Sequence, residues 1–178
     1  MRKTRRGEKI RGFTPIAGRD ARVLILGSMP GKKSLDAREY YAHKQNAFWR
    51  IVADLLGIDR HLPYRKRIHA LKAARIAVWD VLRSCRRSGS MDSGIDRNSE
   101  IANDFRAFFR NHRKISHVFF NGARAAASYE RNVLPELGIH ALRYIRLPST
   151  SPAHASIAYE RKREAWHLIL QPAKRNRP

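Results

Sequence analysis

The chain has 178 residues, of which 37 are Lys or Arg and 15 are Asp or Glu, so its formal net charge at pH 7 is +22. This length suits one domain with a buried core, and such a positive charge favours a polyanionic partner. The single cysteine, Cys85, excludes a disulfide framework and cysteine-bound clusters, and the eight histidines form no metal-binding motif. We therefore expect no metal and no cofactor.

Basic residues gather at both ends of the sequence. We divide the chain into a basic flexible arm (1–12), a single domain (13–172) and a basic tail (173–178). The arms are either solvated tails or nonspecific contacts to phosphates. No stretch approaches the roughly 18 apolar residues of a membrane-spanning helix, and no apolar signal region is present. We expect a soluble, cytoplasmic monomer that is not bound to a membrane.

Four short apolar runs are typical of strands buried on both faces: Arg22–Leu26, Arg75–Val81, His117–Phe120 and Leu142–Leu147. Helical patterns alternate with them. Apolar residues spaced as on one helix face precede Gly57, and Ala123–Leu134 and Tyr159–Leu170 are expected to be further helices. The alternation predicts a three-layer α/β/α sandwich around a mainly parallel four-stranded sheet. The segment Ser84–Asp96 is expected to be a polar loop.

The chemistry of such a sheet lies beyond the carboxyl ends of its strands. The first expected strand is followed by Gly27-Ser28-Met29-Pro30-Gly31, where glycines allow the backbone to approach a ligand. A purely structural turn has the same composition. The sequence lacks a P-loop lysine and the spacing of a dinucleotide fingerprint, so nucleotide use is not indicated.

Aromatic, amide and basic side chains are concentrated in Tyr40–Trp49, just before an amphipathic helix. This mixture suits a pocket for a flat, polar heterocycle. Phe48 and Trp49 are also typical of core packing, and Asn46 of a helix N-cap.

Small hydroxyl residues and prolines fill the segment Leu147–Ser156, after the fourth expected strand. They can offer N–H and O–H donors to phosphates, although a plain loop with an N-cap has the same pattern. A serine hydrolase is disfavoured, because no Gly-x-Ser-x-Gly elbow occurs in the chain.

Taken together and in this order, four segments resemble the uracil-DNA glycosylase superfamily, most closely its hypoxanthine-DNA (deoxyinosine) glycosylase branch. They are LILGSMPGKKSL (Leu24–Leu35), YYAHKQNAFW (Tyr40–Trp49), VWDVLRSCRRSGSMDSGI (Val78–Ile95) and LPSTSPAHA (Leu147–Ala155). The resemblance implies a monofunctional DNA glycosylase of base-excision repair. Its partner would be double- or single-stranded DNA that contains a deaminated base, which the enzyme flips out before cleavage.

The resemblance also assigns roles to residues. Asn46 is the expected catalytic residue, holding a water near the sugar, because Met29 stands where related branches carry a polar residue. Tyr41 should stack on the base, and Asp80 should accept a hydrogen bond from its N1–H unless it caps a helix or pairs with an arginine such as Arg83. The expected base-binding set is Gly27, Ser28, Met29, Tyr41 and Asp80, and the expected DNA-binding set is Ser149, Thr150, Ser151, Pro152, His154 and Ser156.

Three positions depart from patterns of the superfamily. Met29 cannot activate water, Leu147 replaces the leading histidine of the uracil enzymes, and His154 stands where asparagine is commoner in the deoxyinosine branch. Two alternatives therefore stay open. One is a uracil or broad-specificity glycosylase for deaminated bases, and the other is a nucleic-acid-binding protein without catalysis.

Overall fold

The computed structural model of the chain describes residues 7–89, 91–138 and 141–174. Its centre is a four-stranded sheet in which every neighbouring pair is parallel, in the order β3-β2-β6-β7. The strands are β2 (Val23–Gly27), β3 (Ile76–Asp80), β6 (His117–Asn121) and β7 (Arg143–Leu147). Every residue of β2 and β3 is buried, as expected for strands covered on both faces. The predicted parallel sheet is thus confirmed.

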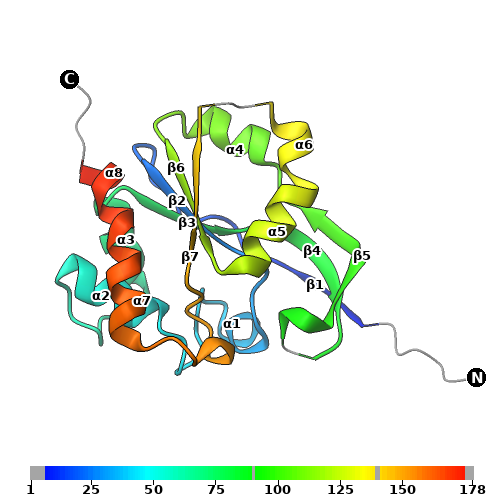
Figure 1. Cartoon of the computed structure of the whole chain (residues 1–178), viewed down its shortest axis with the longest axis horizontal. Helices are drawn as coiled ribbons and strands as arrows, with labels where there is room; N and C mark the ends of the chain where they lie inside the picture. The colour runs from blue at the N-terminus through cyan, green and yellow to red at the C-terminus, as the bar shows by residue number, and fades with distance from the viewer. Residues whose placement is uncertain (1–6, 90, 139–140, 175–178) are drawn as a thin grey trace, which may run out of the picture.

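Helices cover both faces of this sheet, which is seen nearly edge-on in Figure 1. Helices α2, α3, α7 and α8 lie on one side, and α4, α5 and α6 on the other. Their bounds are α1 (Lys32–Ala37), α2 (Phe48–Leu56), α3 (Tyr64–Ala73), α4 (Phe105–Asn111), α5 (Ala123–Asn132), α6 (Leu134–Leu137), α7 (Tyr159–Trp166) and α8 (Leu170–Lys174). Short 3₁₀ turns occur at η1 (Asp92–Gly94), η2 (Pro152–His154) and η3 (His167–Ile169). The three-layer sandwich predicted from the alternation is confirmed.

Local chemistry explains where these helices begin and end. Helix α2 buries Phe48, Ile51 and Val52 on one face, and it ends at Gly57, whose φ of 65° is open to glycine at little cost. The expected helix Ala123–Leu134 is instead split into α5 and α6. Pro135 has no N–H to give to the preceding turn, so α5 cannot continue through it.

A second sheet corrects two expectations from the sequence. Strands β1 (Glu8–Arg11), β4 (Leu82–Arg87) and β5 (Ile95–Ala102) form an antiparallel sheet in the order β1-β4-β5. Both ends of the polar loop expected over Ser84–Asp96 are therefore strand, and the last part of the expected flexible arm is a paired strand. These strands were missed because they carry many polar and charged residues and because β1 pairs with a segment far along the chain.

The basic tail expected over 173–178 also begins differently. Ala173 is buried in the core and belongs to α8, and residues 175–178 lie outside the described part of the chain.

One buried carboxylate, that of Glu100, links strand β5 to helix α5 by hydrogen bonds. The Glu100 side chain is 1% exposed and accepts hydrogen bonds from Arg124, Arg131, Asn132 and Ser128. Although burial raises its pKa, the hydrogen bonds and charges of these partners hold it below its ordinary value. The second sheet is thus held in a fixed position against the central one.

None of the helices within residues 7–89, 91–138 and 141–174 combines the length and the apolar character that crossing a membrane requires.

Candidate active site

The carboxyl ends of the parallel strands meet at one end of the molecule, where the chain leaves β7 near α1 (Figure 1). The connection from β2 leads to β3 on one side, whereas β6 lies on the other side of β2. Open α/β sheets bind their ligands at such a reversal of strand order, and we call the region where these strands end the crevice. The segments that border it are Gly27–Gly31 after β2, Asp80 after β3, Asn121 after β6 and Leu147–Ser156 after β7.

The turn after β2 is held firmly by the second sheet. The carbonyls of Gly27 and Ser28 accept hydrogen bonds from the N–H groups of Val81 (2.8 Å) and Leu82 (3.1 Å). The Ser28 hydroxyl donates to the carboxylate of Asp92. Met29 is buried in the core, so its side chain serves packing, as its apolar character requires.

Arg87 supports the same turn from β4. Its guanidinium Nη1 donates to the carbonyl of Pro30 at 2.8 Å, and the residue is only 3% exposed. A buried guanidinium is costly unless opposite charge lies near it. The carboxylate of Asp92 lies in the same cluster, because burial and Asp92 raise the pKa of Asp80 while Arg87 opposes this rise.

Asp80 is the most perturbed acid of the crevice. It is 3% exposed, and burial, with the nearby charge of Asp92, raises its pKa from 3.8 to about 8. Its Oδ2 has no hydrogen-bond partner among the described residues. At neutral pH the side chain is therefore mainly a neutral acid, which can donate as well as accept a hydrogen bond.

Neither structural alternative for Asp80, a helix cap or an ion pair with an arginine such as Arg83, is found among the described residues. Strand β3 is followed by β4 and not by a helix, so Asp80 caps no helix. Within the described part of the chain, the ion pairs involve Asp54, Glu39, Asp20 and Glu100, and none joins Asp80 to Arg83.

Tyr41 places a second buried polar group near Asp80. Its hydroxyl is buried; burial and the charge of Asp80 raise its pKa, and the Asn121 side chain lies close enough to oppose that rise. The φ of 55° at Tyr41 is rare for a side chain of this size. The Tyr41 and Phe48 rings stack with centroids 4.0 Å apart. Phe48 and Trp49 are core residues, at 0% and 8% exposed, in agreement with the packing alternative for these two.

Gly27 lies against the Asp80 carboxyl group and the Tyr41 hydroxyl. A Cβ built on Gly27 would come within 2.4 Å of Asp80 Oδ1 and 3.1 Å of the Tyr41 hydroxyl. The absence of a side chain here is what lets these two polar groups converge on the backbone of the turn. Burying unpaired polar atoms is expensive, so their arrangement suits a polar ligand that pairs with them.

Gly27→Ala is expected to destabilise the fold by about 1–3 kcal/mol, because the new methyl group collides with Asp80. Thermal unfolding measures this loss. Adding Asp80→Ala to the same chain removes the colliding carboxyl group and should restore most of the stability. If the double variant were as unstable as Gly27→Ala alone, the close approach of Gly27 and Asp80 would be disproved.

Asn46 stands at the start of α2, beside the segment that follows β7. Its Oδ1 accepts a hydrogen bond from the N–H of Phe48, the first residue of α2, at 3.0 Å, although the N-cap position itself is occupied by Ala47. Ala47 donates its N–H to the carbonyl of Thr150 at 3.0 Å. The amide oxygen of Asn46 has a second lone pair, so this hydrogen bond leaves Asn46 able to hold a water.

Asn121 is a site residue that the sequence reasoning missed. It ends β6, donates from Nδ2 to Thr150 Oγ1 at 2.8 Å, and accepts from the Thr150 N–H at 2.8 Å. A polar residue at the end of an apolar run is the signal that could have identified it. Through Thr150, Asn121 joins the end of β6 to the loop after β7 and to α2.

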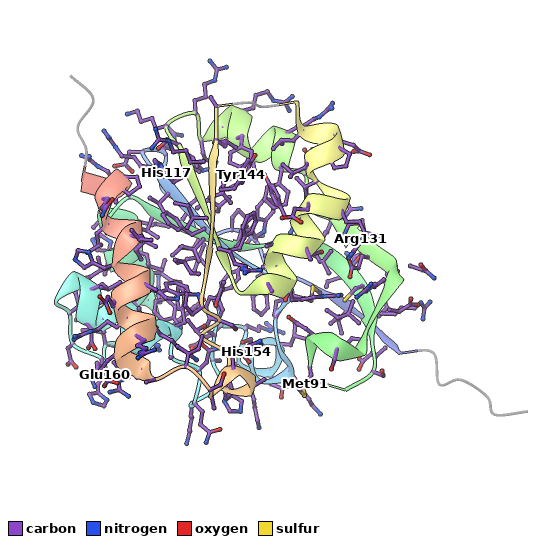
Figure 2. All side chains as sticks on the ribbon, in the orientation of Figure 1. Met91, His117, Arg131, Tyr144, His154 and Glu160 are labelled. Atoms are coloured by element: carbon purple, nitrogen blue, oxygen red, sulfur yellow. The ribbon has the colours of Figure 1, made fainter. Side chains whose placement is uncertain are left out.

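The predicted DNA-binding residues divide into three groups. Thr150 is 1% exposed and fully engaged with Asn121 and Ala47, so it positions the loop and has no free group for a phosphate. Ser149 and Ser151 are half-buried and accept hydrogen bonds from N–H groups of the loop. Exposed positions are Pro152, His154 and Ser156, and Figure 2 shows His154 at the strand-end side of the molecule.

No metal centre accompanies these groups. Within the part of the chain that the structure describes, no three His, Cys, Asp or Glu side chains are grouped closely enough to hold a metal ion.

Comparison with known proteins identifies the family of the chain. The family model of the uracil DNA glycosylase superfamily matches residues 15–170. A protein of Methanosarcina acetivorans described as a hypoxanthine DNA glycosylase is 34% identical over 162 residues, which cover 90% of this chain and 98% of the relative. A protein of Methanosarcina barkeri with the same description is 34% identical over 135 residues, 71% of this chain and 84% of the relative.

A solved structure agrees with these relatives. The solution structure of a Methanosarcina acetivorans protein described as a uracil DNA glycosylase matches with a TM-score of 0.79 at 31% identity, covering 94% of this chain and 100% of that one. The family predicted from four sequence segments is confirmed. On fold, sequence and the extent of the match, the chain belongs to the uracil DNA glycosylase superfamily.

Proposed function

We propose that this protein is a monofunctional DNA glycosylase of base-excision repair that hydrolyses the N-glycosidic bond of a deaminated base, above all hypoxanthine. The observation that carries the proposal is the buried Asp80 carboxyl group, whose Oδ2 has no partner among the described residues and whose Oδ1 lies against the bare backbone of Gly27. Two relatives described as hypoxanthine DNA glycosylases and a net charge of +22 support it.

Recognition begins with extrusion of the nucleotide from the duplex. Extrusion costs a few kcal/mol and is cheapest for a mispaired base, such as hypoxanthine opposite thymine. Tyr41 stacks on the extruded base, and backbone amides of Ser28 and Met29 bond its edge. The neutral Asp80 accepts a hydrogen bond from N1–H of the base and donates its own proton toward O6. This differs from a purely accepting carboxylate, because burial keeps the acid protonated at neutral pH.

Cleavage separates charge between sugar and base. As the bond from C1′ to N9 breaks, its electron pair leaves with the purine and positive charge develops on the sugar. A fixed donor at O6 stabilises the departing purine, and this is the part assigned to Asp80. Asn46 holds the water whose oxygen forms the new bond to C1′, and one proton of that water is lost to solvent.

The loop after β7 holds the DNA during these steps. Ser149, Ser151 and Ser156 contact the flanking phosphates, while Pro152 and His154 lie against the groove near the vacated stack. Thr150 keeps the loop in place through Asn121. Either duplex or single-stranded DNA fits this arrangement, and a monomer suffices for it.

Uracil is the second candidate base. Its N3–H and C4=O present the same donor and acceptor pair to Asp80, and one structural neighbour is described as a uracil DNA glycosylase. The two substrates differ in size, since a pyrimidine leaves part of a purine pocket unfilled.

A single-turnover assay of abasic-site formation tests the proposal. Matched duplexes carry one deoxyinosine, one deoxyuridine or no lesion, and the enzyme is in excess. We expect rapid cleavage at deoxyinosine, slower cleavage at deoxyuridine and none in the undamaged duplex. Faster cleavage at deoxyuridine would assign the enzyme to uracil, and binding without cleavage of any duplex would refute catalysis.

A further inference from the structure

One face of the second sheet is basic and open to solvent. Ile10 on β1 is paired with the buried Cys85 of β4 and packs against the core, so the neighbouring side chains of β1 point outward. These are Lys9, paired with Arg86, and Arg11, paired with Ser84, and all three basic residues are exposed. We call the surface formed by Lys9, Arg11 and Arg86 the basic face.

Like charges stand directly opposite each other on this face. A cross-strand pair such as Lys9 and Arg86 is destabilising unless an anion lies between the two. Asp96 is paired with Arg86 along β4 and β5, but among the described residues no ion pair involves Lys9, Arg11 or Arg86. The Arg86 guanidinium donates to the Gly7 carbonyl at 3.5 Å, and the Arg86 backbone N–H donates to Ser99 Oγ at 2.7 Å. The face therefore keeps an unbalanced positive charge.

A shallow hollow of about 200 Å³ lies on the same face, and its charged lining residues are Lys9 and Arg86. Ser84, Cys85, Ser99 and Ile101 complete the lining, and the Ser99 hydroxyl is engaged with the Arg86 N–H and the Asp96 carbonyl. In sequence, four more basic residues, Arg2, Lys3, Arg5 and Arg6, precede Gly7, where the described chain reaches this sheet.

Strand β4 connects the basic face directly to the active site. Arg86 points to solvent, whereas the next residue, Arg87, points inward and bonds the Pro30 carbonyl of the turn at 2.8 Å. Consecutive residues of β4 thus lie on the two faces of the second sheet, so the basic face and the turn are separated by the thickness of this sheet. Figure 1 shows the sheet beside the strand-end side of the molecule, away from α3.

We propose that the basic face binds the phosphate backbone of duplex DNA flanking the lesion, as a second contact surface beyond the base pocket and the loop after β7. The proposal rests on the proposed function for the position of the lesion. Duplex DNA fits because it presents regularly spaced phosphates, which match a sheet with basic side chains on neighbouring strands. Contacts of this kind add affinity without reading the sequence.

The test compares two variants that remove the same charge. One is Lys9→Ala with Arg86→Ala on the basic face. The matched control is Arg65→Ala with Lys66→Ala, two exposed residues of α3 on the other side of the molecule. Affinity for undamaged duplex DNA is measured from low to physiological salt, and thermal unfolding verifies that each variant is folded.

We expect the slope of log affinity against log salt to become shallower by about 1.8 for the basic-face variant, since each lost phosphate contact contributes about 0.9. The control should keep the parental slope, and Lys9→Arg with Arg86→Lys should keep it as well. Lengthening the duplex on one side of the lesion should strengthen binding of the parental protein but not of the basic-face variant. An unchanged slope in that variant, or an equal loss in the control, would overturn the proposal.

The same preparations separate this proposal from the proposed function. Parental protein that cleaves no lesion would refute glycosylase activity, while the salt slopes on undamaged DNA would still report on the basic face. Conversely, a parental protein that cleaves deoxyinosine while its basic-face variant keeps the full slope would refute this surface alone.

Discussion

Asn46→Ala is expected to lower the single-turnover rate of deoxyinosine cleavage by about a hundredfold or more, a loss of about 3 kcal/mol in transition-state stabilisation. Asn46 is the polar side chain proposed to hold water, and Met29, at the usual position, is buried in the core. Lesion binding should change little, because the contact acts on the water and not on the base. Met29→Ala should have a far smaller effect on the rate.

The hydrogen bond from the Phe48 N–H to Asn46 at the start of α2 calls for a matched variant. The Asn46 Oδ1 accepts from the Phe48 N–H, and loss of such a capping hydrogen bond costs about 1 kcal/mol of stability. Asn46→Ser keeps an acceptor for the cap but shortens the side chain, so it should keep the stability and still lose the rate. A folded Asn46→Ser protein with the parental rate would reduce Asn46 to a helix cap and direct attention to Asp80.

Asp80→Ala and Asp80→Asn are expected to differ strongly. Alanine removes the donor at O6 of the base, and losing one such donor typically costs a hundredfold or more, on the order of 3 kcal/mol. Asparagine keeps one acceptor and one donor in nearly the same shape, so it should keep most of the activity near neutral pH. Single-turnover rates on the deoxyinosine duplex measure both. Equal loss in the two variants would contradict the role of a neutral acid.

The pH dependence follows from the raised pKa of about 8 for Asp80. Above this pH the side chain ionises and loses its proton donor, so the parental rate divided by that of Asp80→Asn should fall about tenfold per pH unit. The free energy of unfolding changes in the same direction. Because the folded protein favours the neutral form of Asp80, the stability of the parental protein relative to Asp80→Asn is greatest below pH 3.8, and this stability is lost as the pH rises through about 8. Melting temperatures between pH 4 and pH 9 measure it, and parallel curves would contradict the shift.

The sequence was sufficient for the central sheet because each of its strands is a short apolar run buried on both faces. Gly27, Asp80 and the loop after Leu147 could be placed at one crevice for the same reason, since parallel strands end at one edge. The sequence prediction carried helix α5 to Leu134, past its end at Asn132, because Pro135, the residue that signals a helix end, lies further along the chain.

The features that could not be predicted from the sequence depend on contacts between distant segments. Strand β1 is stabilised by pairing with β4, about 75 residues later in the chain, and nothing in Glu8–Arg11 alone indicates it. The burial of Thr150 depends on Asn121, which the sequence separates from it. The protonation of Asp80 depends on the burial and charge created by β4 and η1, so its sequence context indicated an ordinary carboxylate.

Release of the free base tests the central claim most directly. The protein is incubated with a duplex that contains one deoxyinosine, and the products are analysed by mass spectrometry and on a denaturing gel. The account predicts free hypoxanthine in the same amount as alkali-labile sites, with the strand intact until alkali is added. A duplex that is bound but releases no hypoxanthine, or a strand cut with inosine still attached, would contradict it.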